Sequence, residues 1–194
     1  MTSRQAAEFD FALERNNWTA EDVKKMSEGD MLAKLLLVVR GRAEVVVRSI
    51  LIFLRSVKVS AQPAVITSEE YFKEAGIGWM GDNFKAQFLG LEVPATGEAE
   101  LNVHKLEEGS VDGPIITELG GEEKAKISVS QFSAFLKDNR GSSEWFLFYL
   151  IGKDGKLWAV DASWRDSDRV WDVRAFSVRF PYGCDAGRQV LSRK

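Results

Sequence analysis

The sequence contains one cysteine and one histidine in 194 residues, and each scarcity excludes a kind of chemistry. Cys184 has no second cysteine to pair with, so an internal disulfide is excluded and a reducing cytoplasm is the expected location. His104 is the only imidazole, and no nucleophile motif adjoins it. Zinc-ligand spacing, an EF-hand pattern and phosphate-binding glycine loops are missing as well. We therefore expect no cofactor and no metal site.

The sequence also lacks a hydrophobic run that is long and uncharged enough to cross a membrane. Five charged residues interrupt its most apolar region, residues 31–54, namely Lys34, Arg40, Arg42, Glu44 and Arg48. Each of them would be costly in hydrocarbon. The N-terminal residues carry acidic side chains and have no apolar signal-peptide core. We interpret residues 31–54 as buried protein and expect no membrane partner.

Charge is unevenly spread along the chain. Residues 1–60 carry 10 Lys and Arg against 8 Asp and Glu, residues 61–144 carry 7 against 15, and residues 145–194 carry 9 against 6. The acidic middle argues against a protein coated in nucleic acid. A local basic segment remains as the basis of an alternative function, nucleic-acid binding. Its candidate contacts are Arg40, Arg42, Arg48 and Arg55.

Residues 1–60 are predicted to form a helical N-terminal unit. Thr19 and Asp22 match an acidic capping box, and the preceding residues 4–15 and the following apolar stretch from Asp30 to Gly41 are also predicted to be helical. Residues 45–58 are ambiguous. Their β-branched residues favour a strand, but their polar residues share one side of a helical wheel, so we predict a helix for the second half.

Residues 61–194 are predicted to form an α+β unit, with a hinge around Pro63 near its start. Ser68 and Asp82 are expected to begin short helices, residues 99–106 an edge strand, and Ser128 a helix over 129–138. Three apolar runs follow, "WFLFYLI", "LWAVDASW" and "VWDVRAFSVRF", joined by loops of hairpin length. The fold class is therefore α+β, with a C-terminal antiparallel meander of three or more strands packed by helices.

A turn centred on Asp154 and Gly155 would pair Tyr149 with Val160 and Trp145 with Trp164. One predicted face then carries Trp145, Leu147, Tyr149, Ile151, Trp158, Val160, Trp164, Val170 and Phe176. The other face is apolar too, so helices must cover much of the sheet. The tryptophans are then core, or part of one face stays open for a partner.

The leading functional hypothesis is a non-enzymatic intracellular binding or assembly module that uses an exposed part of this aromatic face. Its partner would be another protein or a second copy of the chain. The candidate contacts are Trp158, Trp164, Arg174, Tyr182 and Arg188. A carboxylate-based hydrolase is a further alternative, because aspartates gather around one hairpin beside Trp164 and Trp171. These are Asp161, Asp166, Asp168 and Asp172.

Two segments resemble segments that recur in short hypothetical proteins of uncultivated bacteria. They are "WTAEDVKKMSEGDMLAKLLLVVRGRAEV" and the closing "GKLWAVDASW" to "GRQVLSR". Those proteins have no assigned activity, so the resemblance implies no site residues. It implies a modular chain, with a helical unit followed by a sheet unit. In their pattern an aromatic residue often precedes Asp-Ala-Gly, where this sequence has Cys184, which argues against a role for the thiol.

Overall fold

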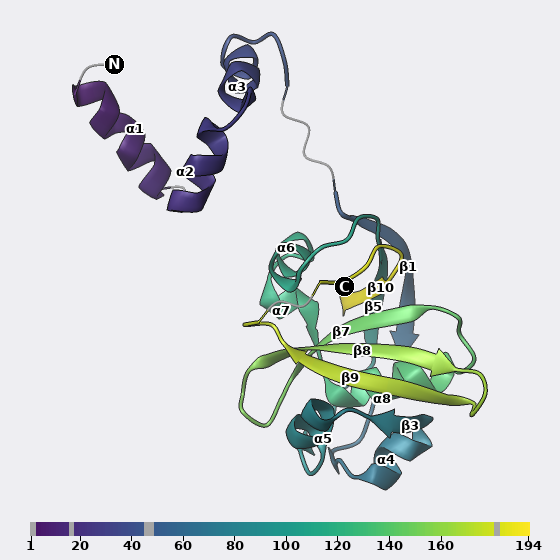
Figure 1. Cartoon of the computed structure of the whole chain (residues 1–194). Helices are drawn as coiled ribbons and strands as arrows, with labels where there is room; N and C mark the ends of the chain where they lie inside the picture. Colours follow the sequence, from purple (N-terminus) through teal and green to yellow (C-terminus); the bar gives the residue numbers. More distant parts are fainter. Residues whose placement is uncertain (1–2, 16–17, 45–48, 181–182) are drawn as a thin grey trace. The chain divides into compact units, whose positions relative to one another are not determined.

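A computed structural model describes residues 3–15, 18–44, 49–180 and 183–194 (Figure 1). The chain divides into two compact units, Met1–Arg48 and Ser49–Lys194. The strand that follows Ser49 therefore belongs to the second unit, although the sequence analysis assigned residues up to 60 to the first. Each unit is described by itself below.

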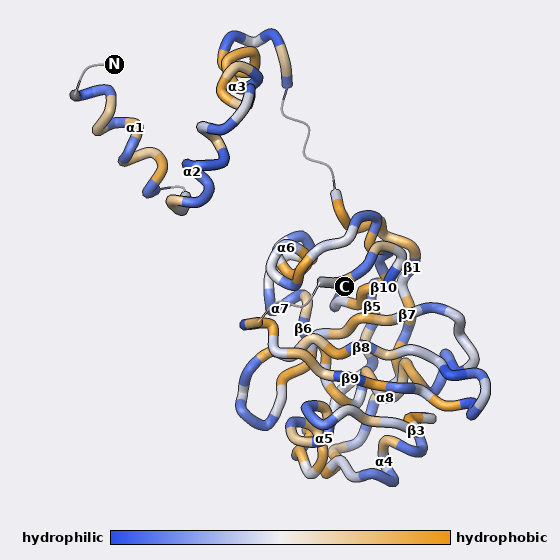
Figure 2. The backbone as a smooth tube through the Cα atoms, viewed as in Figure 1, coloured by the Kyte–Doolittle hydropathy of each residue, from blue (hydrophilic) through white to orange (hydrophobic). Residues whose placement is uncertain are grey.

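The N-terminal unit contains the three predicted helices: α1 (Ser3–Arg15), α2 (Ala20–Ser27) and α3 (Met31–Val39). Thr19 and Asp22 form the expected capping box at the start of α2. Every residue of α3 except Lys34 is apolar (Figure 2), yet none of them is buried. Among the described residues of this unit only Met26 is buried. The unit thus has almost no core of its own, and none of the described helices is long and apolar enough to cross a membrane.

The predicted helix in the second half of 45–58 is wrong, because strand β1 (Leu51–Val59) occupies this segment. β1 pairs antiparallel with β5 (Ala99–Leu106) along its length, and the register shifts between Phe53 and Arg55. Such a bulge interrupts strict two-residue alternation, which made the sequence pattern look helical. Tertiary pairing then decides for the strand that the β-branched residues favour. Residues 45–48 lie outside the described part of the chain.

The second unit is built on a mixed sheet in the order β1-β5-β10-β7-β8-β9-β3, with β6 also paired to β7. The predicted antiparallel meander is present as β7 (Trp145–Ile151), β8 (Leu157–Arg165) and β9 (Val170–Ser177). The strands β10 (Gln189–Arg193), β3 (Ile77–Met80) and β6 (Lys126–Ile127) add parallel pairings. β5 is a strand as predicted, but it lies between β1 and β10 and not at an edge. A separate pair joins β2 (Val65–Ile66) and β4 (Glu92–Val93).

The predicted register of β8 is wrong by one residue. Tyr149 pairs with Ala159 and Trp145 with Ser163, where Val160 and Trp164 were expected. The cause is a three-residue loop, Lys153 to Gly155, closed by a Gly152 N–H bond to the Lys156 carbonyl, with Gly155 at φ 71°. A glycine supplies this left-handed conformation at no steric cost. Because strand side chains alternate, the slip moves all of β8 to the opposite face.

Helices cover one face of the sheet completely and the other in part. The covered face packs against α8 (Val129–Asp138), α4 (Glu69–Glu74) and α5 (Asp82–Phe88). Asp82 is the first residue of α5 and Gly81 its N-cap, a small correction to the prediction. Ser128 caps α8 as expected, and Val129, Phe132, Phe135 and Leu136 form a buried apolar stripe on this helix. The aromatic residues of this core are Phe72, Phe84, Phe88, Phe132, Phe135, Phe146, Phe148 and Trp171.

The second face is covered over β7 and β10 by two helices that the sequence analysis did not predict, α6 (Asp112–Glu118) and α7 (Glu122–Ala125). Ile115 and Ala125 of these helices pack with Leu147 and Val190 of the sheet. In Figure 1, α8 lies behind β8 and β9, and no helix lies in front of these two strands. One end of the second face is therefore left open.

The edge strand β3 depends on Gly78. A Cβ atom at this position would lie 2.6–2.7 Å from the side-chain carbons of Val170 on the neighbouring strand β9. Gly78→Ala must therefore push the two strands apart, and we expect it to lower the free energy of unfolding by about 1–3 kcal/mol in urea titrations.

The matched control is Gly97→Ala, since no atom lies within 4 Å of a Cβ at Gly97 and its φ is not left-handed. We expect this variant to unfold within about 0.5 kcal/mol of the wild type. Equal effects of the two substitutions would show that the contact of Gly78 with Val170 does not constrain β3.

Candidate functional site

The open end of the second sheet face carries two exposed tryptophans. Trp145 of β7, Ser163 of β8, Asp172 of β9 and Trp79 of β3 are successive partners across four strands. Trp145 is 51% exposed and Trp79 is 42% exposed. Neighbouring strands lie about 4.8 Å apart, so the backbone positions of the two tryptophans are about 14 Å apart. We call these four residues, together with Arg174, the open patch.

Each tryptophan of the open patch lies under an arginine. The guanidinium carbon of Arg174 is 5.4 Å from the ring centre of Trp79, and that of Arg188 is 5.2 Å from the ring centre of Trp145. These distances fall within the range of cation–π attraction. Arg174 projects from the same face because its neighbours Val173 and Ala175 point into the covered core. The two pairs hold both indoles in defined orientations.

The arginines differ in how their charge is balanced. Arg188 is buried and bonds to Asp161 at 2.5 Å and to Asp185 at 3.3 Å. Burial opposes its charge, but the hydrogen bond and charge of Asp161 outweigh burial, so the pKa of Arg188 is raised. Arg174 pairs with Asp161 across the strands but forms no ion pair within 4 Å among the described residues. Arg174 is therefore an exposed cation that lies over Trp79, and the charge of Asp161 acts on it from beyond ion-pair distance.

Asp112, Tyr149 and Cys184 form a buried polar cluster beside this site. The Tyr149 hydroxyl donates to Asp112 Oδ1 at 3.0 Å, and Asp112 Oδ2 has no hydrogen-bond partner among the described residues. Burial raises the pKa of Asp112, with the Tyr149 hydrogen bond opposing it. Burial and the charges of Asp112 and Asp161 raise the pKa of Cys184 to about 12. The thiol is therefore protonated at neutral pH, which argues against a nucleophile.

The predicted contact residues do not form one site. Trp158 and Trp164 lie on the covered face: the Trp158 indole N–H donates to Asp154 Oδ1 at 3.1 Å, and Trp164 packs edge-on against the buried Trp171 at 5.2 Å. Arg174 and Arg188 lie at the open patch on the opposite face. Tyr182 lies outside the described residues. Trp158 and Trp164 are both partly buried and pack against the covered core.

Sequence reasoning missed Trp79. It stands in "GIGWMGDNF", between the helices expected to begin at Ser68 and Asp82. Strand β3 has four residues and pairs by a parallel ladder, so the sequence shows too little alternation to indicate a strand. Trp145 was on the predicted face, and its place in β7, in step with Leu147 and Tyr149, was the usable signal. The β8 slip removed Trp158 and Trp164 from that face.

The residues of the alternative functions are also dispersed or neutralised. Arg40 and Arg42 belong to the N-terminal unit and Arg55 to the sheet unit, while Arg48 lies outside the described residues. Asp172 is ion-paired with Arg165 at 3.1 Å, as is Asp168. Asp161 is paired with Arg188, so among these aspartates only Asp166 has no ion pair in the part of the chain that the structure describes.

His104 lies in β5 beside the ring of Phe53, at 5.8 Å between ring centres. Burial lowers its pKa, and the charge of Glu118 opposes that effect. Its Nε2 atom lies 3.4 Å from the Ser192 hydroxyl. Across residues 3–15, 18–44, 49–180 and 183–194, no group of three or more histidine, cysteine or acidic side chains is placed to hold a metal ion.

Comparison with known proteins gives no independent guide to the site. No family model matches the chain, and no match was found among the curated proteins or the solved structures. The functional conclusion therefore depends on the geometry of the open patch alone.

Two tryptophan substitutions test which face is core. Trp164→Ala removes a ring that packs on Trp171, and we expect it to lower the free energy of unfolding by about 2 kcal/mol. Trp79→Ala truncates a ring that is 42% exposed, and we expect a loss below about 1 kcal/mol. Urea unfolding measures both. A larger loss for Trp79→Ala than for Trp164→Ala would contradict the assignment of the two faces.

The buried Asp112 predicts a pH effect of defined sign. Its pKa is raised in the folded state, so the folded protein binds this proton more tightly than the unfolded chain, and ionisation on raising the pH costs stability. Asp112→Asn keeps an acceptor for Tyr149 but cannot ionise. We therefore expect the free energy of unfolding of the variant, minus that of the wild type, to rise as the pH is raised above about 4. A difference in the free energy of unfolding that stays constant or falls as the pH is raised would contradict this prediction.

Proposed function

We propose that the protein is a binding module whose open patch receives a partner protein, with a carboxylate of the partner on Arg174 and apolar side chains on Trp79 and Trp145. The observation that carries the proposal is the placement of Arg174 over the Trp79 ring, with no ion pair to Arg174 among the residues that the structure describes. We further place this function in the cytoplasm, on the ground that a chain with one cysteine gains nothing from an oxidising compartment.

The chemistry of Arg174 favours a carboxylate as its ligand. A guanidinium stacked on an indole loses little conformational entropy when it binds, and its planar fork matches a carboxylate with two hydrogen bonds. Such bonds to charged groups contribute about 1.5–3 kcal/mol each. Tryptophan and arginine are also the residues most enriched at the energetic centres of protein interfaces. The open patch combines both on a rigid sheet.

The spacing of the open patch fits an extended segment. An extended chain advances about 3.3 Å per residue, so four or five residues span the distance of about 14 Å between the backbone positions of the two tryptophans. Apolar side chains at the two ends of the segment would lie on Trp79 and Trp145. An acidic residue near the Trp79 end would meet Arg174.

The charge of the patch surroundings disfavours the nucleic-acid alternative at this surface. Three arginines around the patch face four aspartates, so a phosphate backbone would meet no excess of positive charge. The arginines are Arg165, Arg174 and Arg188, and the aspartates are Asp161, Asp168, Asp172 and Asp185. A single carboxylate meets only the unpaired Arg174 and avoids this repulsion.

Selection of random linear peptides displayed on phage against the full chain tests the proposal. We expect the selected peptides to share one acidic residue flanked by apolar residues. Arg174→Ala should weaken their binding about 10- to 100-fold in fluorescence anisotropy, because it removes charge-assisted hydrogen bonds. Trp79→Ala and Trp145→Ala should also weaken binding.

Arg179→Ala is the matched control, since Arg179 is an exposed arginine outside the open patch. It should bind the peptides as the wild type does. Peptides without an acidic residue, or peptides insensitive to Arg174→Ala, would contradict the proposal. Salt-sensitive binding of a single-stranded oligonucleotide that is lost on replacing Arg40 and Arg42 would favour the alternative. A dimer in light scattering that Trp79→Ala converts to monomers would identify a second copy as the partner.

A further inference from the structure

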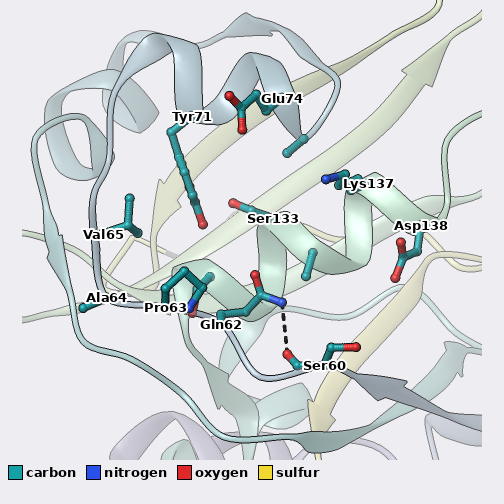
Figure 3. A pocket seen from close by; sticks show the side chains of 13 residues that line it. Ser60, Gln62, Pro63, Ala64, Val65, Tyr71, Glu74, Ser133, Lys137 and Asp138 are labelled. Carbon is teal, nitrogen blue, oxygen red and sulfur yellow. Dashed lines mark hydrogen bonds between the residues drawn. The ribbon is translucent and has the colours of Figure 1, made fainter.

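A pocket of about 480 Å³ opens on the covered side of the sheet unit, away from the open patch. Its walls are α4, α8 and the segment Ser60 to Val65, which precedes and includes the start of β2 (Figure 3). Small-molecule sites have volumes of about 300–1,000 Å³. The pocket is thus large enough for a small ligand, and its lining decides which kind.

Ser133 is the residue that points to a ligand. It is only 5% exposed and lines the pocket from the second turn of α8, and its hydroxyl interacts with the Tyr71 hydroxyl, which lines the same pocket. This interaction uses part of the hydrogen-bonding capacity of each hydroxyl and leaves the rest for a ligand. Ser130, one turn earlier on the same wall, differs because its hydroxyl lies 2.9 Å from that of Ser128.

Tyr71 of α4 presents a second hydroxyl to the same space. In Figure 3 its ring extends from α4 toward α8, and its hydroxyl lies on the side of Ser133. Burial raises the pKa of Tyr71, and the nearby Ser133 hydroxyl opposes this effect. The two hydroxyls together can donate to one acceptor placed between them.

Two opposite charges stand at the mouth of the pocket without meeting each other. Lys137 follows Ser133 by one turn on α8, and Glu74 lies in the last turn of α4. Both are exposed, and neither forms an ion pair within 4 Å among the described residues. Figure 3 shows the ammonium group of Lys137 directed toward the side of Tyr71 and Ser133.

We propose that this pocket binds a small zwitterion of the amino-acid class with an apolar side chain. Its carboxylate accepts from the hydroxyls of Ser133 and Tyr71 and meets Lys137. Its ammonium group meets Glu74. Its side chain rests on the apolar part of the lining, formed by Pro63, Ala64, Val65 and Ala134.

A zwitterion fits better than an anion or a cation alone. A simple carboxylate satisfies Lys137 and the hydroxyls but leaves Glu74 facing an anionic ligand. A simple amine can pair with Glu74 but offers the Ser133 hydroxyl no anionic hydrogen-bond acceptor. Only a ligand with both a carboxylate and an ammonium group can contact Lys137, Glu74 and the two hydroxyls at once. The proposal does not depend on the open patch, because the two sites lie on opposite faces of the sheet.

Isothermal titration calorimetry of the full chain with three matched compounds tests the proposal. L-leucine carries both charges, 4-methylpentanoate is leucine without the amine, and 3-methylbutylamine is leucine without the carboxylate. We expect L-leucine to bind with a dissociation constant in the millimolar range or below. We expect 4-methylpentanoate and 3-methylbutylamine each to bind at least about tenfold more weakly. Absence of heat with L-leucine, or equal binding of 4-methylpentanoate, would overturn the proposal.

Variants then assign the binding to the pocket. Ser133→Ala should change the melting temperature little, because the hydroxyl that it removes interacts with the Tyr71 hydroxyl at the pocket, while weakening L-leucine binding about tenfold. Lys137→Met should weaken L-leucine to a similar degree. Lys85→Met is the control, since Lys85 is an exposed lysine of α5 outside the pocket. Unchanged affinity of Ser133→Ala for L-leucine would overturn the proposal. An equal loss of L-leucine affinity in Lys85→Met and Lys137→Met would overturn it too.

Discussion

The C-terminal strand β10 is the constraint on which the rest of the sheet unit depends. It lies in the middle of the sheet, antiparallel to β5 along Gln189–Arg193 and parallel to β7 at Gln189 and Val190. Its central side chains, Val190 and Leu191, are fully buried on opposite faces. The pair β1–β5 and the group β7–β8–β9–β3 have no other shared ladder in the described residues. The last few residues therefore unite two halves of the sheet that would each expose an unpaired edge.

The same strand positions the chemistry of the open patch. Arg188 immediately precedes β10, so placing β10 beside β7 brings its guanidinium to Asp161 of β8 and over the ring of Trp145. The desolvation cost of burying this arginine is offset by a close ion pair and a second one to Asp185. Among the described residues Arg174 forms no ion pair within 4 Å, although the charge of Asp161 acts on it. The sheet thus places a buried, ion-paired arginine and an exposed one on the same face.

The two proposed sites use the two faces of one sheet for different kinds of ligand. The open patch is flat and aromatic, which suits a segment of another protein, whereas the pocket between α4 and α8 is concave and lined by hydroxyls. The N-terminal unit raises a separate physical question, because α3 exposes an apolar surface that soluble helices normally bury. The apolar side chains of α3 are far more exposed than those of α8, whose apolar stripe, which includes Phe132, is buried.

The sequence by itself determined the local features that depend on neighbours in the chain. The capping boxes at Thr19 and Ser128, the apolar stripe of α8 and the three strands of the meander all follow from short-range hydrogen bonding and alternation. The tertiary structure alone decided β1, the register of β8, the central place of β10 and the meeting of Trp79 with Arg174. Each of these depends on which distant strands pair, or on a one-residue difference in a loop. A one-residue shift reverses every side chain of a strand while leaving its local sequence pattern unchanged.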